Sequence, residues 1–93
     1  MQIKLSNGFK VDINKEVLKD WRFIQSVSYS ESGNDINRVK GVVDLADLLL
    51  GSSKDALIEK IASENDGAVP IDKMSQYISE IILKLKEDNE TKK

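Results

Sequence analysis

The feature that most constrains the fold is a change in the spacing of apolar residues near Asn14. Before it, two short runs within residues 2–13 alternate apolar and polar side chains on either side of Asn7-Gly8. Alternation with a period of two is typical of a half-buried strand, and Asn-Gly is the strongest local signal for a hairpin turn. After Asn14, apolar residues recur every three or four positions, as in an amphipathic helix. The sequence therefore predicts an N-terminal β-hairpin over residues 2–13, followed by helices.

The predicted hairpin has one apolar face. Its members are Ile3, Leu5, Phe9, Val11 and Ile13. An isolated two-stranded hairpin is only marginally stable in water, so this face must pack on the helices that follow.

Capping and breaking residues divide the rest of the chain into about four helices. They are expected at about residues 15–28, 35–50, 53–64 and 70–86. Asn14 suits the N-cap of the first, Gly51 ends the second, and Pro70 suits the first turn of the last. The remaining residues, 87–93, are polar and are predicted to form a flexible tail. The fold class is thus mainly α, with an N-terminal hairpin and a small helical bundle in one domain, residues 1–86.

Helical spacing also predicts which residues of the first two helices face the core. In the first helix the core stripe is expected to comprise Val17, Leu18, Trp21 and Ile24. In the second it is expected to comprise Ile36, Val39, Val43, Ala46 and Leu50. Gly41 lies inside the second helix, where it costs about 1 kcal/mol relative to alanine. A close helix–helix approach and a local bend would each explain this glycine.

The chain's inventory of reactive side chains is small. It contains no histidine and no cysteine, so Ser-His and Cys-His nucleophiles, disulfides and thiolate metal sites are excluded. Carboxylate pairs at helical spacing, such as Asp44 with Asp47, are typical of a solvated helix face. The Asn65-Asp66-Gly67 segment lacks the alternating ligands of a calcium loop and is read as a turn. We expect no enzyme activity, no metal and no cofactor.

Charge and hydropathy restrict the partners. The formal net charge is −2, from 14 basic and 16 acidic residues, so a dedicated nucleic-acid binder is not expected. One alternative remains, in which residues 36–64 form a helix-turn-helix-like adaptor that directs Lys54 and Lys60 toward phosphates. No signal peptide or membrane span is evident, and the lack of cysteine favours an intracellular setting.

Protein binding is the function class that fits this inventory. The apolar stripes of the second and fourth helices are wide, and such width is typical either of a core face in a small bundle or of a groove for a partner helix. The residues singled out as candidate partner contacts are Phe23, Val42, Leu49 and Ile82. Phe23 lies off the predicted stripe, so core and interface both stay open for it. The sequence does not decide whether the chain also self-associates.

Three local patterns resemble a known family. They are the Asn-Gly-Phe turn at residues 7–9, the Leu-Leu-Gly helix end at 49–51, and Gly-x-Val-Pro-Ile-x-x-Met-Ser at 67–75. Together with the order of elements over roughly residues 2–86, they resemble the tail assembly chaperones of long-tailed phages and prophages of Gram-positive bacteria. The stretch between Trp21 and Asp35 departs from the family pattern, which is richer there in leucine and acidic residues.

The resemblance implies a non-enzymatic role in viral morphogenesis. Such a chaperone binds the helical tape-measure protein and helps to recruit tail-tube subunits. It would act in the cytoplasm of the bacterial host and be absent from the mature virion. Relatives commonly exist also as a longer form made by translational frameshifting, which only the nucleotide sequence would reveal.

Overall fold

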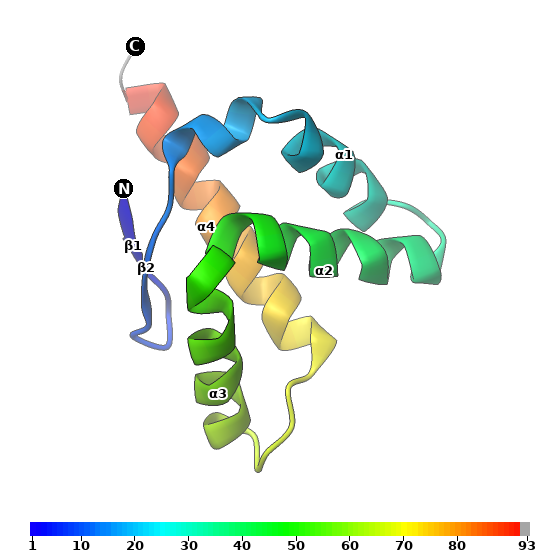
Figure 1. Cartoon of the computed structure of the whole chain (residues 1–93), viewed down its shortest axis with the longest axis vertical. Coiled ribbons are helices and arrows are strands. Elements are labelled where there is room, and N and C mark those ends of the chain that lie inside the picture. The colour runs from blue at the N-terminus through cyan, green and yellow to red at the C-terminus, as the bar shows by residue number, and fades with distance from the viewer. Residues whose placement is uncertain (92–93) are drawn as a thin grey trace.

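The computed structural model describes residues 1–91, with side chains described through residue 88. These residues form a two-stranded antiparallel hairpin followed by helices, as the sequence predicts (Figure 1). The strands are β1 (Gln2–Lys4) and β2 (Lys10–Asp12). The α-helices are α1 (Trp21–Ser30), α2 (Asp35–Leu50), α3 (Lys54–Glu64) and α4 (Ile71–Thr91). Short 3₁₀ helices precede α1 and α3, namely η1 (Lys15–Lys19) and η2 (Gly51–Ser53).

The hairpin turn forms at the predicted Asn-Gly pair. Gly8 has a φ of 89°, which glycine adopts at no steric cost. The Asn7 side-chain oxygen accepts a hydrogen bond of 3.0 Å from the Phe9 amide. The register pairs Ile3 with Val11, so the predicted apolar residues do share one face. All of that face is buried except Phe9, which is half-buried.

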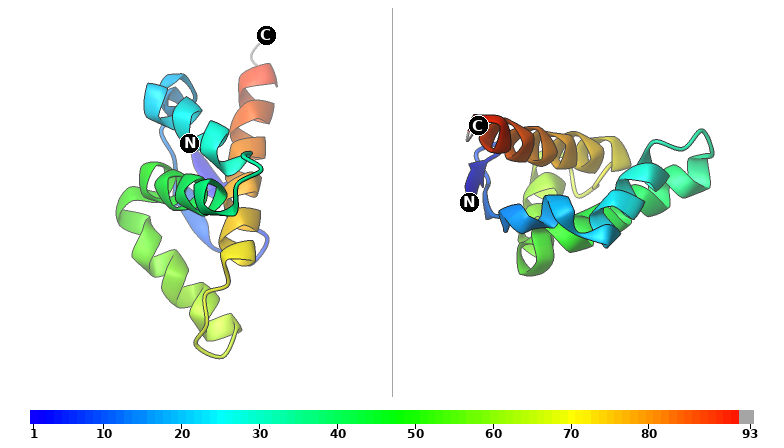
Figure 2. Two further views of the ribbon diagram at one scale, coloured as in Figure 1. Left: turned by 90° about the vertical axis from the view of Figure 1, so that its right-hand side faces the viewer. Right: turned by 90° about the horizontal axis from the view of Figure 1, so that it is seen from above.

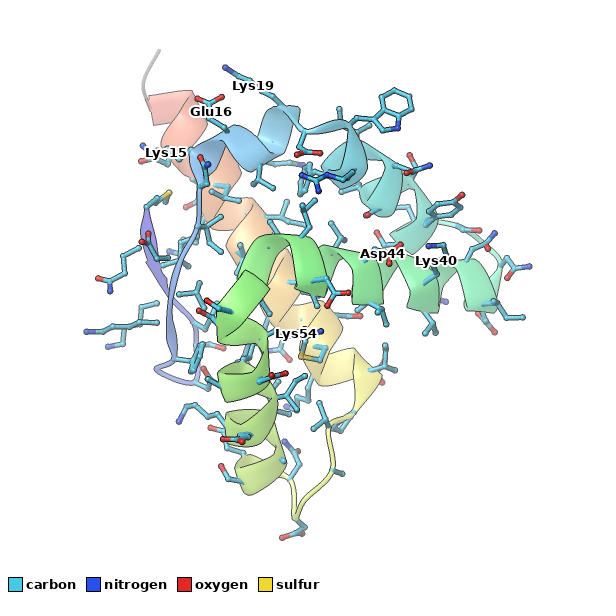
Figure 3. The ribbon with its side chains drawn as sticks, in the orientation of Figure 1. Lys15, Glu16, Lys19, Lys40, Asp44 and Lys54 are labelled. Atoms are coloured by element: carbon cyan, nitrogen blue, oxygen red, sulfur yellow. The ribbon has the colours of Figure 1, made fainter. Side chains whose placement is uncertain are left out.

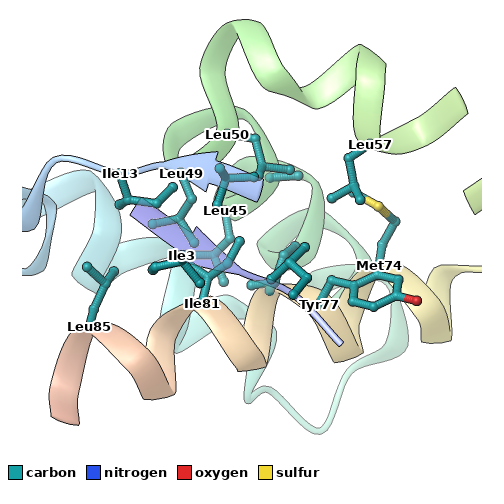
Figure 4. Packing of buried hydrophobic residues seen from close by; sticks show 14 of the residues in the cluster. Ile3, Ile13, Leu45, Leu49, Leu50, Leu57, Met74, Tyr77, Ile81 and Leu85 are labelled. Carbon is teal, nitrogen blue, oxygen red and sulfur yellow. The ribbon is translucent and has the colours of Figure 1, made fainter. Parts of the chain in front are cut away.

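The core lies where this hairpin face meets α2, α3 and α4. Figure 4 shows Ile3 and Ile13 beside Leu45 and Leu49 of α2, with Ile81 of α4 completing the cluster. The C-terminal half of α2 is therefore the part that enters the core, and α1 contributes one buried apolar side chain.

The predicted helix over residues 15–28 is wrong, because the chain breaks it at Asp20. Asn14 does cap a helix, but η1 ends at Lys19. Asp20 has an extended backbone with ψ of 131°, and its carboxylate accepts a hydrogen bond of 2.8 Å from the Arg22 amide. Aspartate is a strong N-cap residue, so a new helix starts at Trp21 and runs to Ser30.

The restart changes which face of α1 is buried. The predicted stripe placed Trp21 and Ile24 in the core, yet their side chains are 74% and 51% exposed. Phe23 is buried instead, at 6%. The stripe assumed one continuous helix from residue 15, and the break at Asp20 removes that continuity.

In α2 the predicted bounds, 35–50, are confirmed, and two of the five residues of the predicted stripe are buried. Asn34 caps the helix by accepting hydrogen bonds from the amides of Ile36 and Asn37. Ala46 and Leu50 are buried as predicted. The N-terminal members of the stripe are exposed, because this half of α2 extends past α4 (Figures 1 and 2). The exposed members of the predicted stripe are Ile36, Val39 and Val43.

Gly41 marks a close approach of two helices rather than a bend. A β-carbon placed there would lie 2.3 Å from the backbone nitrogen of Ser30 and 2.7 Å from the carbonyl oxygen of Ser26. Glycine therefore lets α1 and α2 pack backbone against backbone.

The last two helices begin and end near their predicted limits, with one extension. Gly51 ends α2 with a φ of 51°, and α3 starts at Lys54. Helix α4 starts just after Pro70 but continues to Thr91, beyond the expected end at residue 86. A salt bridge of 2.6 Å joins Lys15 to Asp88 and holds the added turn against η1. Residues 92–93 of the expected tail lie outside the described residues.

Over residues 1–91, none of the helices combines the length and hydropathy needed to cross a bilayer.

Candidate protein-binding groove

A groove separates the α1–α2 pair from α4. The groove has a volume of about 730 Å³ and is lined by residues of all three helices. Apolar side chains of all three helices lie partly uncovered in it.

The floor of the groove is apolar. It is formed by two side chains from each helix, namely Phe23, Val27, Val42, Leu45, Ile78 and Ile82. Three of these are half-buried rather than buried, because no residue in the described part of the chain covers their outer side. The three half-buried side chains are Val27, Val42 and Ile82. Apolar surface left partly open in this way gains free energy when a partner covers it.

Each rim of the groove carries one large exposed apolar side chain. Ile24 of α1 is 51% exposed and Leu83 of α4 is 57% exposed. Single exposed hydrophobics are ordinary on protein surfaces. Two of them lining the same apolar groove add to its exposed apolar surface, and large exposed apolar surfaces mark binding sites.

Four serines and three charged residues also line the groove. Ser75 and Ser79 lie one helical turn apart on α4 and line the groove there. The charged lining residues are Glu31, Arg38 and Lys86. Arg38 lies 3.4 Å from Asp35 in an exposed pair, which is a weak interaction in water.

The groove stays open because α1 is held against α2 and away from α4. The contact at Gly41 places the C-terminal part of α1 against α2, and the Asp20 cap sets where α1 begins. The Arg22 guanidinium donates hydrogen bonds of 3.0 and 2.8 Å to the two oxygens of Asp20. Those bonds, with the bond from the Arg22 amide, lower the pKa of Asp20 from 3.8 to about 2. The cap therefore remains charged over the whole physiological pH range.

The structure brings together three of the four residues singled out from the sequence. Phe23, Val42 and Ile82 all line the groove. Leu49 does not, because it is 5% exposed and packs in the core. Sequence reasoning missed Leu83, although it follows Ser75 and Ser79 at a spacing of four along one helix face.

A cluster of polar side chains outside the groove joins the hairpin to α3 and α4. The Ser6 amide and hydroxyl donate hydrogen bonds of 2.8 and 2.7 Å to the two carboxylate oxygens of Glu80. Asn7 donates one of 3.3 Å to Glu64. Burial of Tyr77, with Glu64 and Glu80 nearby, raises the pKa of its phenol above 10. These contacts fix the hairpin and serve the fold.

The lysines of the helix-turn-helix-like segment are paired with acids of the same chain. Lys54 pairs with Asp47, and Lys60 lies 3.8 Å from Glu64. On the outer face of α2, Lys40 similarly pairs with Asp44 at 2.7 Å (Figure 3). The hydrogen bond to the carboxylate, followed by the charge of that carboxylate, raises the pKa of Lys40 and of Lys54.

Catalytic and metal-binding arrangements are not found among the described side chains. No three acidic groups come together there as a metal site requires. No family model, curated protein or solved structure matches this chain.

Proposed function

We propose that this protein is a tail assembly chaperone of a long-tailed phage or prophage, and that it binds the tape-measure protein without catalysing a reaction. The observation that carries the proposal is the groove between α1, α2 and α4. Its apolar floor and its two exposed apolar rims offer what an amphipathic helix needs. Tape-measure proteins are long and helical, so they present such helices in abundance.

Two further observations support this function. The chain lacks histidine and cysteine, which removes the usual nucleophiles and general bases. The three sequence patterns at residues 7–9, 49–51 and 67–75 resemble those of the chaperone family. The proposed site of action is the cytoplasm of the bacterial host, with tail-tube subunits as later partners and no place in the mature virion.

A nucleic-acid adaptor is the weaker proposal. Lys54 and Lys60 would have to leave Asp47 and Glu64 before they could contact phosphates. The segment 36–64 also contains more acidic than basic side chains. Phosphate binding needs uncompensated cations, so we expect no salt-dependent shift of duplex DNA by this chain.

Co-expression tests the chaperone function. The full chain would be tagged and produced with the tape-measure protein encoded in the same genome. We expect the tape-measure protein to remain soluble and to co-purify with the chain. An insoluble tape-measure protein that the chain neither solubilises nor captures would overturn the proposed function.

A further inference from the structure

We propose that the groove selects an acidic amphipathic helix, one whose apolar stripe is bordered by glutamate or aspartate. This inference deepens the proposed function, because it states the chemistry of the tape-measure segment that would be bound. It follows from the shape of the groove and from the charges at its edge.

The shape of the groove favours a helix over a small ligand. A small apolar molecule on the floor would leave Ile24 and Leu83 exposed, because these side chains stand on opposite rims. A helix is roughly 10 Å across with its side chains, so its apolar stripe can reach the floor while its flanks cover both rims. The short side chains of Ser75 and Ser79 let a helix backbone come close to α4.

The charges of the groove oppose the net charge of the chain. The chain as a whole carries −2, whereas the groove lining contains two cations, Arg38 and Lys86, and one anion, Glu31. Lys86 makes no ion pair with any side chain described through residue 88. Arg38 pairs with Asp35 at an exposed position, so it can leave Asp35 for another carboxylate at little cost in free energy. The groove therefore attracts carboxylates on an otherwise acidic molecule.

A matched pair of peptides tests this selection. Both would be helical and share one leucine stripe at i, i+3, i+4 and i+7 spacing, with either glutamates or lysines on the two flanks. Binding to the full chain would be measured by titration calorimetry at low and high salt. We expect the glutamate peptide to bind about tenfold more tightly at low salt, and the difference to shrink at high salt as screening sets in.

The acidic net charge makes this test demanding. Attraction to the molecule as a whole favours the lysine peptide, so only local charges at the groove can produce the opposite preference. Equal binding of the two peptides, or tighter binding of the lysine peptide, overturns the inference.

Charge-reversal variants locate the effect. The double substitution Arg38→Glu with Lys86→Glu is expected to reverse the preference. The control, Lys73→Glu with Lys84→Glu, changes the net charge equally at exposed positions of α4 outside the groove lining, and should keep the preference for the glutamate peptide. A preference that survives the groove double variant would overturn the inference.

The remaining outcomes separate this inference from the proposed function. If the glutamate peptide binds but the tape-measure protein does not, the groove chemistry holds and the chaperone function fails. If neither peptide binds, the groove is not a helix site, and co-purification with the tape-measure protein then tests the chaperone function independently. Self-association that Leu83→Glu abolishes would identify a second copy as the occupant and overturn the assignment to a partner.

Discussion

At Gly41 the backbones of α1 and α2 meet, and this contact sets the position of one wall of the groove. We expect Gly41→Ala to destabilise the fold by about 1 to 3 kcal/mol, because the added methyl group meets the backbone of Ser30 and overpacked sites cost this much. The gain in helix propensity, about 1 kcal/mol, offsets only part of it. Urea unfolding followed by circular dichroism measures the difference.

Gly33 provides the control for that substitution. A β-carbon there meets nothing within 4 Å, so Gly33→Ala should change the free energy of unfolding by less than about 0.5 kcal/mol. Equal effects at the two glycines would contradict the close approach of α1 and α2.

Trp21 is exposed although helical spacing predicts it in the core, and Phe23, for which the sequence leaves core and interface open, is buried. Phe23→Ala is expected to cost about 3 kcal/mol, since it removes a buried aromatic ring. Trp21→Ala should cost less than about 1 kcal/mol, because the indole is mostly in water. Urea midpoints of the two variants measure this, and a larger loss for Trp21→Ala would contradict the break at Asp20.

Tyr77 links stability to alkaline pH. Its pKa is raised in the folded chain, so the unfolded chain loses the phenol proton first, near pH 10. The free energy of unfolding should therefore fall as pH rises above about 10, and be unaffected by this group below that value. Urea titrations between pH 8 and 11 measure the slope.

Lysines whose pKa is raised by a paired acid also make the free energy of unfolding fall at alkaline pH, so a control variant is needed. Tyr77→Phe removes the phenol and keeps the ring, and it should make the fall above pH 10 shallower. An unchanged slope would show that Tyr77 is not the group responsible.

At the scale of whole elements, the hairpin is tied to α4 by one carboxylate. Glu80→Ala removes both acceptors of the Ser6 hydrogen bonds. Because the site is solvent-accessible, we expect a loss of about 1 kcal/mol, which is roughly a fivefold faster exchange of the Ser6 amide hydrogen. Exchange measured by NMR tests this. Glu87→Ala, at an exposed position of the same helix, should leave the exchange rate unchanged.

The elements differ in how much of them the sequence predicts. The hairpin and α2 follow from local signals, namely the Asn-Gly turn, the Asn34 cap and the Gly51 stop, so their limits are predicted well. The limits of helix α1 are not predicted well, because Asp20 fits the interior of a helix and an N-cap equally. Only the packing of Phe23 and the Arg22 hydrogen bonds decide between these readings.

At the scale of the molecule, the groove is a consequence of how elements are placed. Sequence patterns indicate that the α2 stripe is wide, which leaves core and groove open, and they single out Phe23, Val42 and Ile82 together with Leu49. They do not show that α2 extends past α4, which leaves Ile36 in water, or that Leu49 is covered by the hairpin. Those facts depend on contacts between segments far apart in the chain.

The most direct test of the account compares two variants of equal chemistry in binding to the tape-measure protein. Leu83→Glu places a charge on the rim of the groove, and Val43→Glu places one at a similarly exposed position of α2 outside the groove lining. Circular dichroism first establishes that both variants are folded. We then expect Leu83→Glu to weaken binding by about tenfold or more, and Val43→Glu to bind like the unaltered chain. Unchanged binding by Leu83→Glu, or a loss confined to Val43→Glu, would contradict it.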